Sequence, residues 1–143
     1  MQRLLYVSES HISQSDAATT VLAIVKHAEI KNDQIGVTGA LIFTGQHFAQ
    51  VLEGPADAIS LLMDNIFNDA RHSNILIACK APIISRLFPD WTMAYHGSNP
   101  YVSRQVTTLL ETTSRSGLTL AAGRLIELAS EFSKRQVPSQ QLH

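Results

Sequence analysis

Apolar and polar positions alternate in two short stretches, residues 4–8 (LLYVS) and 47–54 (HFAQVLEG). Alternation with a period of two is typical of β-strands, whose successive side chains point to opposite faces of a sheet. Further apolar stretches at 35–43, 75–83 and 91–96 predict three more strands. The Thr44-Gly45-Gln46 turn joins two of the five strands into a hairpin.

Four helices are expected where apolar residues recur at intervals of three and four positions. The first follows SQSD at 13–16, which resembles a capping box, and runs to about Lys31. The second opens at Gly54-Pro55 and the third at Asn99-Pro100, and SRSG at 114–117 separates the third from the fourth. The four apolar stripes are Ala18, Val21, Leu22, Val25 and Ala28; Ile59, Leu62, Met63, Ile66 and Phe67; Val102, Val106, Leu109 and Leu110; and Leu118, Ala121, Ala122, Leu125, Leu128, Ala129 and Phe132.

The order of these elements, β-α-β-β-α-β with an added strand, predicts an α+β fold, a ferredoxin-like sandwich with a five-stranded mixed sheet. Right-handed crossovers place the first two helices on one face and make the first and third strands neighbours in the centre. The other face is also hydrophobic and needs a cover, which the C-terminal helices supply. We therefore expect a sheet domain over 1–97, a two-helix cap over 98–135 and a flexible tail over 136–143.

Composition excludes several classes of protein. The 11 basic and 12 acidic residues among 143 are scattered, which argues against direct nucleic-acid binding and against an anionic membrane surface. Cys79 is the only cysteine, so no internal disulfide forms, and the histidines lack metal-site spacing. The N-terminus lacks a signal-peptide core, and no apolar run is long enough to span a membrane. We expect a cytoplasmic protein without a metal.

Three polar residues lie on otherwise apolar elements: Tyr6 and Gln50 on adjacent central strands, and Asn32 at the end of the first helix. Each has a structural explanation, because Tyr6 and Gln50 can bond to backbone groups and Asn32 can cap a helix. Together they describe a cleft between the sheet and the first two helices, with amide groups turned into it. A planar heteroaromatic ligand with donors and acceptors would satisfy them.

Five motifs in order now carry a family resemblance. They are LLYVS near the start, N-x-x-x-G-V-T-G-A-L-I-F at 32–43, F-x-Q-x-L-E-G at 48–54, D-x-R-H at 69–72 and R-x-F-x-x-W-x-M at 86–93. Over about residues 2–97 the chain resembles the BLUF family of blue-light sensors that use flavin. It is similar to the short members, which have no attached enzymatic domain, so the resemblance implies a photoreceptor rather than an enzyme.

The resemblance implies a non-covalently bound FAD, with FMN and riboflavin as alternatives, held over residues 1–97. Ile24 and Ile66 would sandwich the ring, Asn32 would pair with its polar edge, and Gln50 would lie between the ring and the Tyr6 hydroxyl. By family analogy Tyr6 transiently reduces the excited flavin, and Gln50 is left rotated or tautomerised. The other residues assigned to the cofactor are Phe48, Lys31, Asp69, Arg71 and His72. Asn65 stands where many members have an arginine, so Lys31 is expected to compensate near the phosphate.

Trp91 and Met93 are expected to share a face of the fifth strand and to exchange places beside Gln50, with Ser8 as a supporting hydrogen-bond partner. The output would pass through the helices at 100–135 to an unidentified signalling protein, and the apolar tail favours a homo-oligomer, a dimer or larger. Two alternatives are a light-independent ferredoxin-like regulator that binds a small ligand and an acylphosphatase-like enzyme. The enzyme needs an arginine-bearing phosphate loop, and the first turn, SESHISQS, has no arginine.

Overall fold

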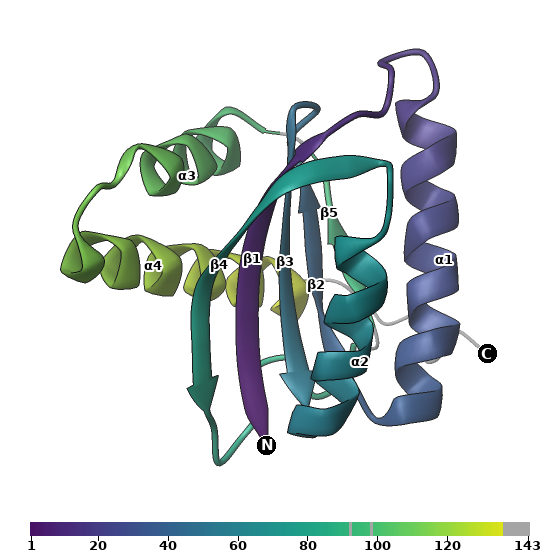
Figure 1. Ribbon diagram of the computed structural model, residues 1–143, viewed down its shortest axis with the longest axis vertical. Coiled ribbons are helices and arrows are strands. Elements are labelled where there is room, and N and C mark those ends of the chain that lie inside the picture. The colour runs from purple at the N-terminus through teal and green to yellow at the C-terminus, as the bar shows by residue number, and fades with distance from the viewer. Residues whose placement is uncertain (92, 98, 136–143) are drawn as a thin grey trace.

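The computed structural model of the chain describes residues 1–91, 93–97 and 99–135. Its elements follow the predicted order (Figure 1). They are β1 (Gln2–Ser10), α1 (Ala17–Ile35), β2 (Thr38–Phe43), β3 (His47–Gly54), α2 (Ala56–Phe67), β4 (His72–Pro82), β5 (Ala94–His96), α3 (Pro100–Glu111) and α4 (Arg115–Lys134). The tail expected at 136–143 lies outside the described residues.

The five strands form one mixed sheet in the order β4-β1-β3-β2-β5, in which β2 and β5 are parallel and the other pairs are antiparallel. Helices α1 and α2 lie on one side of the sheet, and α3 and α4 lie on the other (Figure 1). Tyr6 of β1 is the register partner of Gln50 of β3. The predicted ferredoxin-like α+β sandwich, with the first and third strands as neighbours, is therefore confirmed.

The first core lies between the sheet and α1 and α2. Leu4 and Leu52 come from its floor, Val21 and Val25 from α1, and Ile59 from α2. All five are buried, with at most 8% exposure across this core. Because side chains of a strand alternate between faces, this core takes the even-numbered residues of β1 and β3.

The second core lies between the opposite face of the sheet and the C-terminal helices. It takes the odd-numbered residues of the same strands, including Leu5 and Val51, which pack with helix residues that are almost fully inaccessible to solvent. These are Val102, Val106 and Leu109 of α3 and Ala122, Leu125 and Ala129 of α4. The C-terminal segment therefore covers the hydrophobic face, as the sequence predicts.

Local signals explain the start of α3. The Asn99 side chain accepts a hydrogen bond from the Val102 backbone N–H at 2.9 Å, and Pro100 occupies the first turn. The start of α1 differs from the prediction, because its N-cap residue Asp16 makes no capping bond through its side chain. The Asp16 carboxylate instead accepts the Ser13 hydroxyl at 2.9 Å, so the capping box at 13–16 is wrong.

The end of α1 lies beyond the predicted one. The helix continues past Lys31 to Ile35 and stops at Gly36, whose positive φ of 73° suits a left-handed C-cap. As a result β2 begins at Thr38 rather than at residue 35, and Asn32 lies inside the last turn of the helix.

Four apolar residues assigned to helix stripes are exposed: Leu22 by 54%, Phe67 by 52%, Leu110 by 38%, and Ala18. Each belongs to a stripe broader than the surface its helix buries against the sheet. Phe67 is also the last residue of α2, where little of the sheet remains to cover it.

Among the described residues, no helix is long and apolar enough to span a membrane.

Candidate functional site

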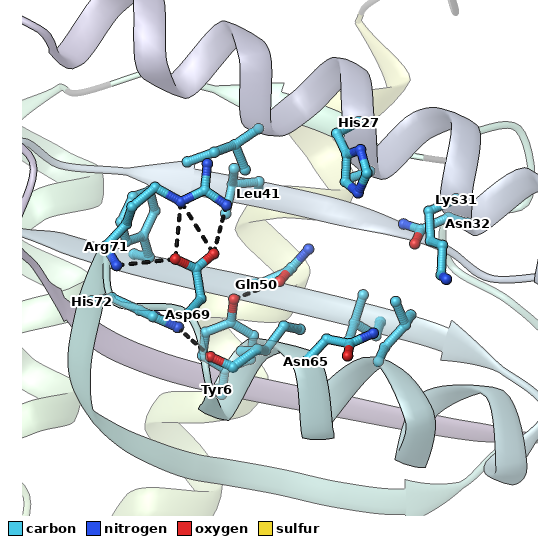
Figure 2. Close-up of a pocket in the computed structure, with 16 residues that line it drawn as sticks. Tyr6, His27, Lys31, Asn32, Leu41, Gln50, Asn65, Asp69, Arg71 and His72 are labelled. Carbon is cyan, nitrogen blue, oxygen red and sulfur yellow. Dashed lines mark hydrogen bonds and ion pairs between the residues drawn. The ribbon is translucent and has the colours of Figure 1, made fainter.

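A pocket of about 380 Å³ lies between α1, α2 and the sheet. This volume is within the range of about 300–1,000 Å³ that is typical of small-molecule sites. Every residue that the sequence assigned to a cofactor lines it: Tyr6, Ile24, Lys31, Asn32, Phe48, Gln50, Ile66, Asp69, Arg71 and His72. Figure 2 shows most of their polar side chains around the same space.

Tyr6 and Gln50 form the polar centre of the pocket floor. The Tyr6 hydroxyl donates to Gln50 Oε1 at 2.5 Å, and Gln50 Nε2 lies 3.6 Å from Met93 Sδ on its other side. All three side chains are buried, so their polar atoms depend on one another rather than on water. Gln50 is therefore held between a strong and a weak partner, and rotation of its amide would exchange donor and acceptor between them.

Burial also determines the protonation of Tyr6. Loss of water around the phenol raises the pKa of Tyr6 far above its ordinary value of about 10, and the nearby Asp69 carboxylate adds to this rise. Tyr6 is thus a neutral hydrogen-bond donor throughout the physiological range.

Ser8 lies on the same face as Tyr6, but its hydrogen-bond partner is His72. Ser8 Oγ lies 2.7 Å from His72 Nδ1, and His72 Nε2 lies 2.7 Å from the Ile66 carbonyl oxygen. Because a carbonyl can only accept, Nε2 must carry the proton, and in the neutral ring Nδ1 accepts from the serine hydroxyl. These two hydrogen bonds fix the His72 imidazole edge-on to the Tyr6 ring, with ring centroids 6.0 Å apart.

Asp69 and Arg71 form an ion pair at one end of the pocket (Figure 2). The Arg71 guanidinium donates to both carboxylate oxygens, at 2.5 Å through Nη2 and at 2.9 and 3.1 Å through Nε, and the Arg71 backbone N–H adds a fourth bond at 2.9 Å. Hydrogen bonding by Arg71 holds the pKa of Asp69 below its usual value despite partial burial, and the same contact raises the pKa of Arg71. The pair presents an oriented guanidinium at this rim.

The opposite end of the pocket has a different character. His27 and Lys31 lie four positions apart on α1, and Asn65 comes from α2 across the opening (Figure 2). Asn32 is buried to 1% exposure, whereas His27 and Lys31 are exposed. Sequence analysis missed His27 as a pocket residue, because an exposed histidine on a helix has no signal until the helix face is known.

The side walls are apolar and face each other. Ile24 of α1 and Ile66 of α2 are both half-buried and line the pocket from opposite helices. Two branched aliphatic walls, with amides of Asn32 and Gln50 at the edges, fit a flat aromatic ring with donors and acceptors on its rim. A flavin ring has this chemistry.

The structure contradicts one prediction about the segment after β4. Trp91 and Met93 do not share a strand face, because β5 begins only at Ala94. Met93 belongs to the core beside the pocket, whereas Trp91 packs against the core beneath α3 and α4. Neither residue lies in β5, so strand alternation does not apply to them.

Among residues 1–91, 93–97 and 99–135, no group of three or more histidine, cysteine, aspartate or glutamate side chains could hold a metal ion.

The fold and the pocket define an α+β ligand-binding domain with a cleft for a planar heteroaromatic. Residues 1–94 match the family model described as BLUF, sensors of blue-light using FAD, and the chain therefore belongs to the BLUF family. It is a blue-light-sensing domain that uses flavin. The light-independent alternatives are not favoured.

Known relatives support this assignment. The chain is 30% identical over 93 residues to photoactivated adenylate cyclase subunit beta of Euglena gracilis, covering 65% of this chain but only 11% of that protein. Two solved structures match over nearly their whole length. The BlsA photo-activated state has a TM-score of 0.73 at 26% identity, covering 87% of this chain and 94% of that one. The dark-state structure of BlrB, a BLUF protein, has a TM-score of 0.70 at 30% identity, covering 85% of this chain and 96% of that one.

Proposed function

We propose that the chain senses blue light through a hydrogen-bond switch made by Tyr6 and Gln50, and that it signals by protein contacts rather than by catalysis. The observation that carries this proposal is the 2.5 Å bond from Tyr6 to Gln50 Oε1 on the floor of the pocket. When bound, a flavin absorbs blue light and supplies a strong photo-oxidant.

Tyr6 is placed to release an electron together with its hydroxyl proton. Gln50 Oε1 accepts the hydrogen bond along which that proton moves, so no water molecule is needed between the two side chains. The high pKa of Tyr6 keeps the proton on the phenol in the dark. After the electron and the proton return to Tyr6, a rotated or tautomerised Gln50 presents a different pattern of donors and acceptors to Tyr6 and Met93.

The remaining pocket residues orient the ring. Asn32 pairs with its N3–H and carbonyl edge, Arg71 donates to the ring from the opposite end of the pocket, and Ile24 and Ile66 hold the two faces. Phe48 and His72 support Tyr6 from behind, with their own ring centroids 6.1 Å apart. All of these groups line the pocket in the structure, and this preorganisation reduces the conformational entropy that is lost when a ligand binds.

We assign the phosphate of FMN or FAD to the end of the pocket near Lys31. Lys31 supplies a positive charge there, and His27 lies one helical turn away on the same wall. Asn65 contributes no charge, so the mouth holds a phosphate by a lysine rather than by a guanidinium fork.

We propose that residues 1–97 form the sensor and residues 98–135 the output cap. Helices α3 and α4 cover the sheet face opposite the pocket, so a shift of β3 or of the segment before β5 acts directly on them. The output is a contact with an unidentified cytoplasmic signalling protein, made by a homo-oligomer of this chain.

The test is an absorption spectrum of purified protein, loaded with FAD, FMN or riboflavin, in darkness and after blue light. We expect flavin bands that shift slightly to longer wavelength and recover in darkness. A protein that binds none of the three flavins, or that binds one without a reversible shift, would overturn the proposal.

A further inference from the structure

The charged residue nearest the switch along β3 is Glu53, three positions after Gln50. It is 0% exposed, although its neighbours on that side of the sheet are hydrophobic. Side chains three apart on a strand point to opposite faces, so Glu53 lies away from the pocket and belongs to none of the contacts described above. A buried carboxylate must be compensated by charge and hydrogen bonds, and its partners identify its role.

The Glu53 carboxylate has two kinds of partner. Arg3 of β1, its register partner, donates to Oε2 at 2.8 Å and forms an ion pair 19% exposed on the arginine side. The backbone N–H groups of Leu87 and Phe88 donate to the same carboxylate at 2.8–3.0 Å. These two amides belong to the irregular segment between β4 and β5, so Glu53 binds that segment to the sheet.

Arg86 reinforces the attachment. Its guanidinium donates to Thr38 Oγ1 at 2.9 Å, to the Glu53 carbonyl at 3.3 Å and to the Gly36 carbonyl at 2.8 Å. Phe88 is 0% exposed in the core under the C-terminal helices, and its carbonyl accepts the Trp91 N–H at 3.3 Å. Residues 86–88 are thus anchored by side chain, backbone and core at once.

The same segment ends at the switch. Met93 lies only five residues after Phe88 and contacts Gln50 Nε2. The segment is therefore fixed at two points to one strand, at Glu53 on one face and at Gln50 on the other. Between these two points the Trp91 carbonyl accepts a hydrogen bond from the Gly39 N–H at 2.9 Å. The Trp91 indole packs against the core under α3 and α4.

We propose that Glu53 is a positioning residue that anchors residues 86–88 and so sets how readily the contact between Gln50 and Met93 re-forms after the light-driven change at Gln50. This inference rests on the proposed photoswitch. A segment held at Glu53 keeps Met93 close to Gln50, so their contact re-forms quickly. Without the anchor, Met93 samples more positions, and its contact with Gln50 re-forms more slowly in darkness.

The test compares flavin-loaded Glu53→Gln with the unmodified chain. An amide keeps the volume but removes the charge and leaves one accepting oxygen in place of two, so its N–H groups must face the Arg3 guanidinium or the Leu87 N–H, and the attachment is weakened. We expect hydrogen exchange at Leu87 and Phe88 to accelerate roughly tenfold or more while the β1–β3 ladder is unchanged. Emission of Trp91, the only tryptophan, should shift to longer wavelength, and dark recovery should slow about threefold.

Two further variants complete the design. Arg86→Gln removes the bonds from the segment to Thr38, Gly36 and the Glu53 carbonyl at a partly exposed position. It therefore tests the anchor even where Glu53→Gln fails to fold. We expect the same changes as in Glu53→Gln, but smaller. Glu131→Gln, in an exposed ion pair with Lys134, is the matched control and should change nothing.

The outcomes separate the two proposals. Unchanged exchange at Leu87 and Phe88 in both anchor variants overturns the anchor, and faster exchange with an unchanged recovery rate overturns its coupling to the switch. If the unmodified chain itself shows no light response, the proposed function fails, together with the coupling. The exchange and Trp91 measurements then still decide whether Glu53 anchors the segment.

Discussion

The two faces of the sheet are built from the same strands but differ in how completely they are filled. The face under α3 and α4 is a closed hydrophobic core with Leu125 and Leu109 at 0% exposure. The face under α1 and α2 is packed only in part and holds the pocket of about 380 Å³, which core residues such as Leu52 and Leu62 also line. The first face supplies stability, and the second gives up part of its packing to hold a ligand.

This difference separates two kinds of substitution. A change at the polar residues that line the pocket should alter the optical response more than folding, whereas a change in the core under α3 and α4 should do the opposite. The two sets of residues are interleaved along β1 and β3, so matched pairs of variants can be made within one strand or one layer.

The largest expected effect is complete loss of the light response. Gln50→Leu keeps the volume on the pocket floor but removes the amide that links Tyr6 and Met93. We expect flavin to bind and the reversible absorption shift to disappear, and Tyr6→Phe should do the same because it removes the hydroxyl. Difference spectra before and after blue light are the measurement. A normal photocycle in either variant would contradict the assigned mechanism.

Leu125→Ala should produce the largest loss of stability. The side chain is fully buried in the cap core, so the cavity should lower the free energy of unfolding by roughly 2–5 kcal/mol. Urea unfolding measures this, and flavin affinity of the folded protein should stay unchanged. Leu120→Ala is the control, because Leu120 lies on the same helix and is 57% exposed. Equal losses in the two variants would argue against a closed cap core.

Lys31→Gln tests the mouth of the pocket. We expect affinity for FMN to fall roughly three- to tenfold, the loss of one exposed charge contact, with little change for riboflavin. Titration of protein by flavin fluorescence gives both constants. Lys26→Gln removes an exposed charge from the same helix outside the pocket, and it should leave the ratio of the two affinities unaltered.

The smallest effect is a pH dependence of folding that comes from Tyr6. Its pKa is raised in the folded protein, whereas the unfolded phenol ionises near pH 10. The contribution of Tyr6 to the free energy of unfolding is therefore full below about pH 10 and is lost as the pH rises further. Tyr6→Phe should make the decline between about pH 9.5 and 11 shallower. Tyr101→Phe, at a ring 55% exposed, should leave it unchanged.

Much of the pocket could be predicted from the sequence, because its floor follows from regular strands. Alternation placed Tyr6 and Gln50 on one face, and the expected topology made their strands neighbours. The position of Asn32 near the end of a helix was also visible, although the helix continues to Ile35. Regular periodicity combined with a known topology is enough to bring these three residues together.

The segment before β5 could not be predicted in the same way. Strand alternation assigned Trp91 and Met93 to one face, whereas an irregular backbone sends them to opposite cores. Glu53 did leave a signal, a charge within an apolar alternating stretch, but its partners Leu87 and Phe88 bond through backbone N–H groups, which no side-chain pattern reveals.

The alternation of β1 and β3 has a consequence for saturation mutagenesis. A library covering residues 5–8 and 49–51, scored both for protein abundance and for colour change under blue light, should give two profiles with a period of two and opposite phase. Leu5, Val7 and Val51 would dominate the abundance profile, whereas Tyr6 and Gln50 would dominate the optical one. The two profiles would thus separate, within each central strand, the positions that stabilise the fold from the positions that produce the light response.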